Sequence, residues 1–235
     1  MEKYKTTIVC VVLNLYNESM KDGRNKDGKY SFSFEVSGQL ACFTAPDAFP
    51  CNVTYPFATL SACEGWIKHI AYQKSARAVV EKLEICSALH YESFDFLNSS
   101  YGRYAGNVTK GSCDVIKRTC LRDVCYKVFG YTESDLRYPQ KGVNNRHAYQ
   151  CMLLRGIKRG LSKHPIYLGT SDFPVNYFGE LREDTQPLHT FNITIPRMLV
   201  RTFDTFKHGE QKAKFATVTA KNGIVIYEDT HANVG

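Results

Sequence analysis

The stretch Tyr30-Ser31-Phe32-Ser33-Phe34-Glu35-Val36 alternates large apolar side chains with smaller polar ones. Successive side chains of a β-strand point to opposite faces of its sheet, so the alternation predicts a half-buried strand over residues 30–36. We expect the aromatic residues of this strand to belong to the core rather than to a base-stacking platform, because an alternating stripe is more often core. The preceding segment, residues 21–28, is polar and holds two glycines, which indicates a loop between an N-terminal extension and the folded body.

Two helices are predicted further along the chain. Ser61 and Glu64 have the spacing of a capping box, and apolar residues follow at helical spacing, so we expect a helix over residues 61–73. Residues 145–160 show the same periodicity, with basic residues on another face, and predict a second helix.

Strands are expected between and after these helices. Residues 78–90 are apolar and partly β-branched, and the segments 113–116 and 124–131 predict two further strands. Near the end, Asn222-Gly223 separates residues 215–219 from 224–227, which is a strong hairpin signal. This order of elements is typical of an α+β fold with a ferredoxin-like core and a β-rich C-terminal part. We therefore expect an extension over residues 1–29, a core over 30–169 and a β-rich part over 170–235.

Composition narrows the class of protein. The 235 residues are 43% hydrophobic and 23% charged, enough to build a core, which excludes a disordered, collagen-like or coiled-coil chain. Since no apolar run approaches the roughly 18 residues that cross a bilayer, no membrane partner is expected.

The nine cysteines form no C-x-x-C pair and share no zinc-ligand spacing with a histidine. We interpret them as buried free thiols of a cytoplasmic protein, and no metal or other cofactor is expected. A secreted glycoprotein with disulfides is the alternative, because two lysines precede an apolar run over residues 7–16 and five N-x-S/T sequons occur.

Positive charge is concentrated in one segment. Residues 136–163 contain no acidic residue, and their charge of +7 equals the net charge of the whole chain. A solvated helix face usually intersperses acids with bases, so this segment predicts a surface that binds nucleic acid phosphates. Its cationic side chains are those of Arg137, Lys141, Arg146, Arg155, Lys158, Arg159 and Lys163.

Six short motifs, in unbroken order between residues 30 and 228, resemble the CRISPR-associated Cas-five family in its type I-C branch. The clearest is Gly38–Asp47, which is similar to the family's G-x-x-A-C-F-T-R-P-E, with Ala45 in place of its usual arginine. The others are Val53-Thr54-Tyr55, Ser61-Ala62, Arg122–Tyr126, Asn145-Arg146-His147 and Pro165–Gly169 followed by Asp172-Phe173-Pro174.

The resemblance implies a ferredoxin-like fold of the RAMP superfamily. It also implies a metal-independent endoribonuclease that cuts precursor CRISPR RNA at the repeat hairpin. Such a protein then stays on the 5′ handle of the guide, in a Cascade surveillance complex with a large subunit and a backbone subunit. The family's catalytic residues carry over to Tyr55, Arg146 and His147, and Arg137, Lys141, Arg155, Lys158, Arg159 and Lys163 are expected to bind RNA.

Metal-free RNA cleavage needs a base for the 2′-hydroxyl, an acid for the 5′-oxygen and positive charge for the phosphorane. A histidine such as His147 can take either proton role near neutral pH, and Tyr55 could position the 2′-hydroxyl, act as an acid or stack on a base. Arg146 replaces the usual lysine and stays protonated, so it can bind phosphate but cannot transfer a proton. This substitution favours the alternative of a subunit that binds RNA without cleaving it.

Overall fold

The computed structural model describes residues 29–48, 52–98, 114–135, 138, 144–203 and 211–227. Arg137 and Lys141, together with residues 1–28 of the expected extension over residues 1–29, lie outside this part of the chain. The helices are α2 (Leu60–Ile70) and α4 (Asn145–Arg159), with a short 3₁₀ helix, η1, over Pro46–Ala48. The strands are β1 (Tyr30–Ala41), β2 (Asn52–Val53), β3 (Ala76–Ile85), β4 (His90–Asn98), β5 (Asp114–Ser134), β6 (Tyr177–Gly179), β7 (Ile193–Phe203), β8 (Gln211–Lys221) and β9 (Ile224–Ile226).

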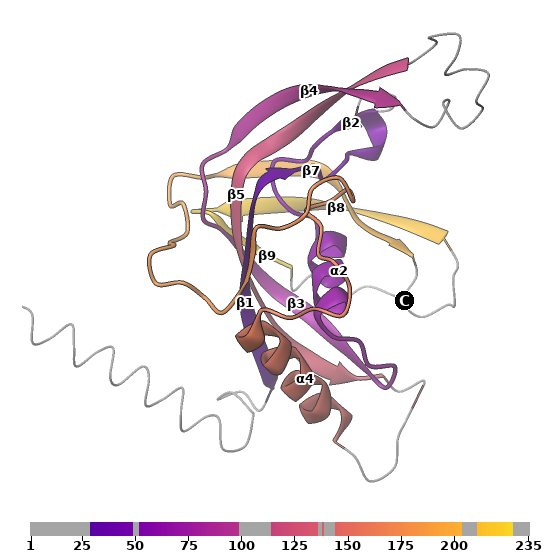
Figure 1. Ribbon diagram of the computed structural model, residues 1–235, viewed down its shortest axis with the longest axis vertical. Helices are drawn as coiled ribbons and strands as arrows, with labels where there is room; N and C mark the ends of the chain where they lie inside the picture. Colours follow the sequence, from indigo (N-terminus) through magenta and orange to yellow (C-terminus); the bar gives the residue numbers. More distant parts are fainter. Residues whose placement is uncertain are drawn as a thin grey trace, which may run out of the picture.

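One large sheet connects the described strands (Figure 1), in the order β6-β1-β5-β3-β9-β8-β7, and β2 and β4 pair with β5 beside this path. β1 is antiparallel to both of its neighbours, β5 and β6, and β3 is antiparallel to β5. The structure is therefore a mixed α and β fold built on a mostly antiparallel sheet, as the sequence predicted. Because β6 and β9 pair with β1 and β3, strands from beyond residue 170 join the same sheet as the expected core.

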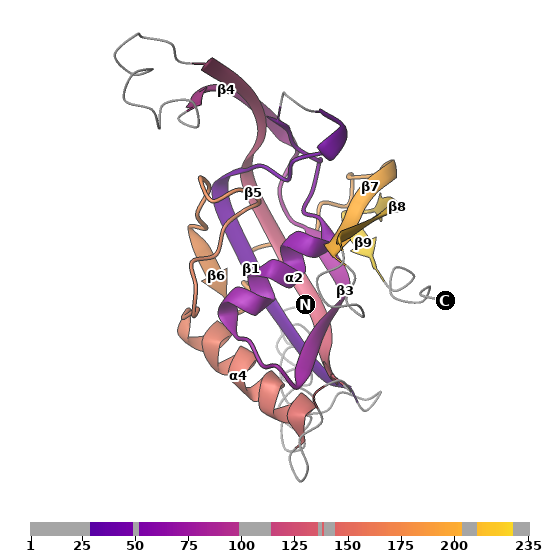
Figure 2. The same cartoon turned by 90° about the vertical axis from the view of Figure 1, so that its right-hand side faces the viewer.

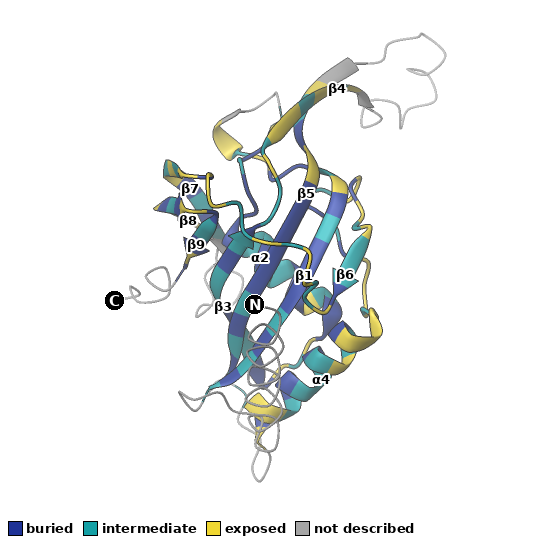
Figure 3. Cartoon of the chain, turned by 90° about the vertical axis from the view of Figure 1, so that its left-hand side faces the viewer, coloured by how far each residue is buried: buried dark blue, intermediate teal, exposed yellow. Residues whose placement is uncertain are grey.

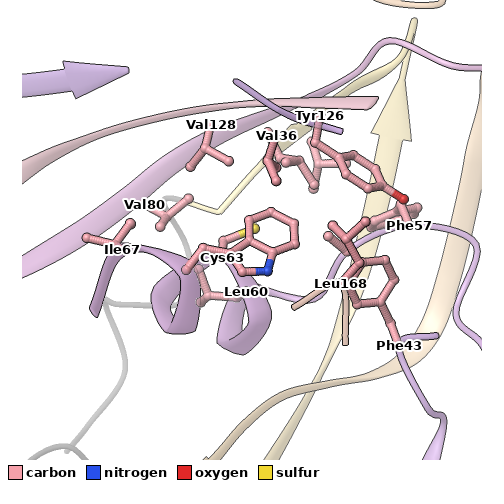
Figure 4. Close-up of a cluster of buried hydrophobic side chains, with 14 of the residues drawn as sticks. Val36, Phe43, Phe57, Leu60, Cys63, Ile67, Val80, Tyr126, Val128 and Leu168 are labelled. Carbon is pink, nitrogen blue, oxygen red and sulfur yellow. The ribbon is translucent and has the colours of Figure 1, made fainter. Parts of the chain in front are cut away.

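Both helices lie on one face of this sheet, in front of β1, β5 and β3 in Figure 2 and behind them in Figure 3. The apolar face of α2 packs on the strands through Leu60, Cys63 and Ile67 (Figure 4). The strand side chains opposite them are Val36, Val80, Tyr126 and Val128. Burial of this apolar surface is the main contribution to the stability of the fold.

The half-buried strand expected at residues 30–36 is confirmed as the first part of β1. Tyr30, Phe32, Phe34 and Val36 are buried, whereas the serines between them are only partly covered. Phe32 and Phe34 therefore belong to the core rather than to a base-stacking platform.

α4 begins and ends close to the residues that the sequence predicted. The Asn144 side chain accepts a hydrogen bond from the amide of His147, and Gly160 ends the helix in the left-handed conformation. Such a capping side chain is common at the start of a helix, and such a glycine is common at its end. Tyr149, Leu153 and Ile157 form the buried face of the helix.

The expected capping box at the start of α2 is wrong. Thr59 caps this helix, with its hydroxyl accepting a hydrogen bond from the amide of Ala62, and Ser61 already lies inside the helix. Glu64 does not fold back to the cap, because it forms an ion pair with Arg201 of β7 at 2.6 Å.

The two strands expected at residues 113–116 and 124–131 form one long strand, β5, of which the structure describes residues 114–134. Its first part pairs with β4 and its later part with β1 and β3. The charged residues between the two apolar segments misled the prediction, because they lie in the part of β5 that extends beyond the core with β4 (Figure 1).

The hairpin near the C-terminus is confirmed. β8 and β9 are joined by Asn222 and Gly223, both with positive φ, as a two-residue turn of this kind requires. No helix in the described ranges has both the length and the apolarity needed to cross a membrane.

Candidate nucleic-acid interface

The N-terminus of α4 is tied to the start of β1. Asn144 accepts a hydrogen bond from the His147 amide at 3.3 Å and donates one from its side-chain nitrogen to the Tyr30 hydroxyl at 2.6 Å. Tyr30 is buried at the first position of β1. One side chain thus caps the helix and fixes its end against the sheet.

Arg146 and His147 lie over the ring of Tyr30. The guanidinium carbon of Arg146 is 5.4 Å from the centroid of that ring, and the His147 ring centroid is 5.5 Å from it. Both side chains are exposed. The imidazole Nε2 of His147 also lies 3.4 Å from the Cys151 thiol, one helical turn away.

These two side chains can act on a phosphodiester. An exposed imidazole can give or take a proton near neutral pH. A guanidinium binds two phosphate oxygens at once, and the amides at a helix N-terminus favour negative charge. Arg146, the predicted phosphate-binding cation, and His147, the predicted proton donor or acceptor, therefore lie together at the exposed N-terminus of α4.

The outward face of α4 continues the positive charge. Arg155, Lys158 and Arg159 are exposed, and their spacing of 8, 11 and 12 residues from His147 puts them on the same side of the helix. None of the ion pairs in the described ranges involves these three residues, and α4 itself contains no acidic residue. We call Arg155, Lys158 and Arg159 the basic face. Lys163, also exposed, follows shortly after the helix.

The structure does not bring Tyr55 to this site. Tyr55 is only 6% exposed, and its amide donates to the carbonyl of Phe43, just past the end of β1. Its hydroxyl accepts a hydrogen bond from the amide of Leu199 at 3.0 Å. Tyr30 and His147 lie at the opposite end of β1, about 35 Å away along a strand that rises roughly 3.3 Å per residue. Tyr55 therefore cannot share a reaction centre with His147 in this conformation.

Two other tyrosines lie toward the α4 end of the sheet. Tyr30 contacts His147 directly. Tyr72, which is 57% exposed, follows Ala71, whose carbonyl accepts a hydrogen bond from the Tyr149 hydroxyl of α4 at 3.0 Å. Neither Tyr30 nor Tyr72 was predicted to lie near His147. The sequence assigned Tyr30 to the core, and the motif pointed to Tyr55 instead. The position of Tyr72 after the last apolar residues of a predicted helix was the one available signal.

Six cysteines are described, and all six are free thiols: Cys42, Cys63, Cys86, Cys120, Cys125 and Cys151. No group of three or more histidine, cysteine or acidic side chains in the described ranges could hold a metal ion.

Comparison with known proteins identifies a relative that matches part of the chain. The chain is 28% identical over 147 residues to the CRISPR pre-crRNA endoribonuclease Cas5d of Thermus thermophilus, which is 61% of this chain and 61% of that relative. Over this span the chain is similar to a Cas-five protein. The match spans less than two thirds of the relative's length. No family model matches the sequence.

Solved structures share the fold of this chain. A crystal structure of a CRISPR-associated protein superposes with a TM-score of 0.63 and 20% identity, over 84% of this chain and 91% of that chain. A functionally uncharacterised protein of Streptococcus mutans superposes with the same TM-score and 16% identity, over the same shares of the two chains. At these identities the likeness concerns the fold alone.

Proposed function

We propose that this protein belongs to the Cas-five family, binds the repeat hairpin of precursor CRISPR RNA, cleaves it without a metal ion, and stays on the 5′ handle of the product. The observation that carries the proposal is the placement of Arg146 and His147 side by side at the exposed N-terminus of a helix whose outward face is basic. The relative from Thermus thermophilus, named a pre-crRNA endoribonuclease, supports the same activity.

The proposed reaction is an attack of the RNA's own 2′-hydroxyl on the adjacent phosphorus. The bond between the 2′-oxygen and phosphorus forms, and the bond between phosphorus and the 5′-oxygen breaks. A proton leaves the 2′-hydroxyl and another reaches the 5′-oxygen, giving a 2′,3′-cyclic phosphate and a free 5′-hydroxyl. His147 performs one of these proton transfers. Arg146 and the amides at the start of α4 stabilise the charge that develops on the phosphorane.

A ferredoxin-like RAMP core is the fold that we propose for residues 30–179. The order β6-β1-β5-β3 supports it, since α2 connects β1 to β3 and α4 connects β5 to β6 on the same face of the sheet. This division extends the core predicted over residues 30–169 by one short strand. The β-rich part then comprises β7, β8 and β9.

The proposed setting is a type I-C surveillance complex in the cytoplasm, with a large subunit and a backbone subunit as protein partners. A second candidate function, crRNA binding without cleavage, is favoured by one feature. Arg146 occupies the position where the family that the sequence resembles usually has a lysine, and an arginine cannot donate the proton that a lysine could. In that case the same basic face would hold the RNA, and another enzyme would cut it.

The two candidates separate in one experiment. Purified protein in excess is incubated in EDTA with end-labelled repeat RNA, and binding and cleavage are followed in parallel. We expect one cut and a product ending in a 2′,3′-cyclic phosphate. A 2′-deoxy substitution at the mapped nucleotide should block the cut while leaving binding intact. Bound but intact RNA would support the binding-only function, and RNA that is neither bound nor cut would overturn both.

A further inference from the structure

β5 carries two cysteines that each lie opposite a cysteine of a neighbouring strand. The paired residues of β3 and β5 end at Ile85 and Tyr126, so Cys86 and Cys125 come next in antiparallel order. The amide of Cys86 donates to the carbonyl of Cys125 at 2.9 Å, and their thiols are in hydrogen-bond contact. Opposite residues of such a pair have Cα atoms about 4.5–5.5 Å apart, and a disulfide needs about 4.4–6.8 Å. A disulfide between these two cysteines therefore requires no movement of the strands.

The second pair has the same arrangement but is closed to solvent. The paired residues of β1 and β5 end at Ala41 and Leu121, and Cys42 and Cys120 come next. Hydrogen bonding to Cys120 lowers the pKa of Cys42 to about 7, so acidity alone would favour oxidation of this pair. Neither of these two thiols is exposed, however, whereas Cys86 is only half-buried. Access therefore favours the pair of Cys86 and Cys125.

The two thiols of the accessible pair differ in acidity. The hydrogen bond with Cys125 and the charge of Lys127 hold the pKa of Cys86 below its ordinary value of 9.0. They outweigh burial and the carboxylates of Glu84 and Glu35, which raise it. The pKa of Cys125 is raised instead, by its bond with Cys86, by burial and by Glu35. Because the thiolate is the attacking form, Cys86 is the nucleophile of this pair and Cys125 stays protonated.

We propose that Cys86 is a modification site for low-molecular-weight disulfides, and that Cys125 converts the adduct into a reversible disulfide between β3 and β5. Cysteines that respond to oxidants are typically accessible and have a second, resolving cysteine beside them. Cys86 and Cys125 have this arrangement. The inference does not depend on the proposed RNA function, because it uses neither His147 nor the basic face.

The reaction is two successive thiol–disulfide exchanges. The Cys86 thiolate attacks one sulfur of the small disulfide, the bond between the two small sulfurs breaks, and one small thiolate leaves. Cys125 then loses its proton and attacks the Cys86 sulfur, and the second small thiolate leaves. Two protein thiols are thereby oxidised to one disulfide, the small disulfide is reduced to two thiols, and these thiols take up the two protons through the solvent.

Oxidation also changes a contact of the segment that follows β6. The Cys125 thiol donates a hydrogen bond to the buried carboxylate of Glu35 at 3.3 Å. The same carboxylate accepts hydrogen bonds from Arg182 and Thr185, which tie that segment to β1. A disulfide sulfur carries no hydrogen, so Glu35 loses one of its donors when Cys125 is oxidised.

Peptide mapping by mass spectrometry tests the proposal on the full chain. Reduced protein is incubated with oxidised glutathione, free thiols are blocked with an alkylating reagent at successive times, and linked peptides are identified. We expect the bridge between Cys86 and Cys125 to form about 10-fold or more faster than one between Cys42 and Cys120. Reduced glutathione in excess should reverse it.

Three serine variants separate the roles of the two thiols. Cys125→Ser should accumulate glutathione on Cys86, because the resolving thiol is absent, and its hydroxyl can still donate to Glu35 and preserve the fold. Cys86→Ser should leave Cys125 unmodified over the same time. Cys120→Ser removes the other β5 cysteine that faces a cysteine, and this matched control should form the bridge at the wild-type rate.

Three results would overturn the inference. The first is wild-type protein in which glutathione does not modify Cys86. The second is a wild-type Cys86 that keeps its glutathione or forms a bridge to a cysteine other than Cys125. The third is a bridge between Cys42 and Cys120 that forms first, which would show that acidity rather than access selects the reactive pair.

Discussion

Tyr30 and His147 lie ring against ring, with centroids 5.5 Å apart and planes tilted by 40°. The first residue of β1 therefore sets the position of an imidazole on α4, and the Asn144 side chain connects the two through the Tyr30 hydroxyl and the helix cap. The chemistry proposed for His147 depends on this packing as much as on the histidine itself.

Substitutions of Asn144 test whether this side chain connects Tyr30 to His147. Asn144→Ala removes the cap and the bond to Tyr30, so we expect it to lower the free energy of unfolding by about 1 kcal/mol and to slow cleavage. Asn144→Ser keeps a capping oxygen and should recover most of the stability. Urea denaturation and single-turnover cleavage of repeat RNA provide the two measurements. Equal values for both variants would show that the cap does not position His147.

Arg146 is expected to act through its charge. Arg146→Lys keeps a cation at the helix end and should cleave at a rate within several-fold of the wild type, whereas Arg146→Ala should lose about 10²- to 10³-fold. The rate is measured with RNA bound to saturation, so that weakened binding does not contribute. A wild-type rate in Arg146→Ala would remove this residue from the reaction.

The basic face is expected to bind phosphates. Replacing Arg155, Lys158 and Arg159 by glutamine should weaken RNA binding. It should also reduce the slope of log affinity against log salt by up to about 2, at roughly 0.7 per phosphate contact. The matched control removes three cations from β7 and β8: Arg197, Lys214 and Lys221. If both triple variants show the same slope, the effect is one of net charge and the basic face has no special role.

The hydrogen bonds around Glu35 lead us to expect that the folded protein is less stable in acid. Burial alone would raise the pKa of this carboxyl, but hydrogen bonds from the Arg182 backbone and side chain, Thr185 and Cys125 outweigh it and hold the pKa below its ordinary value of 4.5. A carboxyl with a lowered pKa stabilises the fold fully above its unfolded pKa and loses that contribution as the pH falls through its folded pKa.

The free energy of unfolding should therefore decrease as the pH is lowered from about 5, and it should decrease less steeply in Glu35→Gln. Urea denaturation between pH 3 and pH 7 measures both slopes. Asp47→Asn, at an exposed carboxyl, is the control. Parallel curves for the wild type and Glu35→Gln would show that this carboxyl does not titrate differently in the folded state.

Local signals in the sequence predicted the elements that local interactions form. The periodicity of residues 145–160, the Asn222-Gly223 turn and the alternation of residues 30–36 each correspond to an element of the structure. The start of α2 was misread, because Thr59 and Ser61 both offer a capping hydroxyl. Thr59 is the cap, and Glu64, whose spacing pointed to Ser61, forms a tertiary ion pair with Arg201 instead.

The proposed site was also predictable only in part, because local spacing in the sequence does not encode tertiary contacts. Arg146, His147 and the basic face follow one another on a single helix, so their spacing alone brings them together. Tyr55 comes from a distant segment, and which end of β1 it approaches depends on its hydrogen bonds to Phe43 and Leu199. No spacing in the chain encodes such a contact.

The catalytic role of His147 is tested most directly by the single-turnover cleavage rate of His147→Ala on repeat RNA in EDTA, with His189→Ala, at an exposed turn, as the control. We expect His147→Ala to cleave about 10²- to 10⁴-fold more slowly than the wild type while binding RNA with nearly the same affinity. We expect His189→Ala to behave as the wild type. Cleavage by His147→Ala at the wild-type rate would contradict a catalytic role of this histidine.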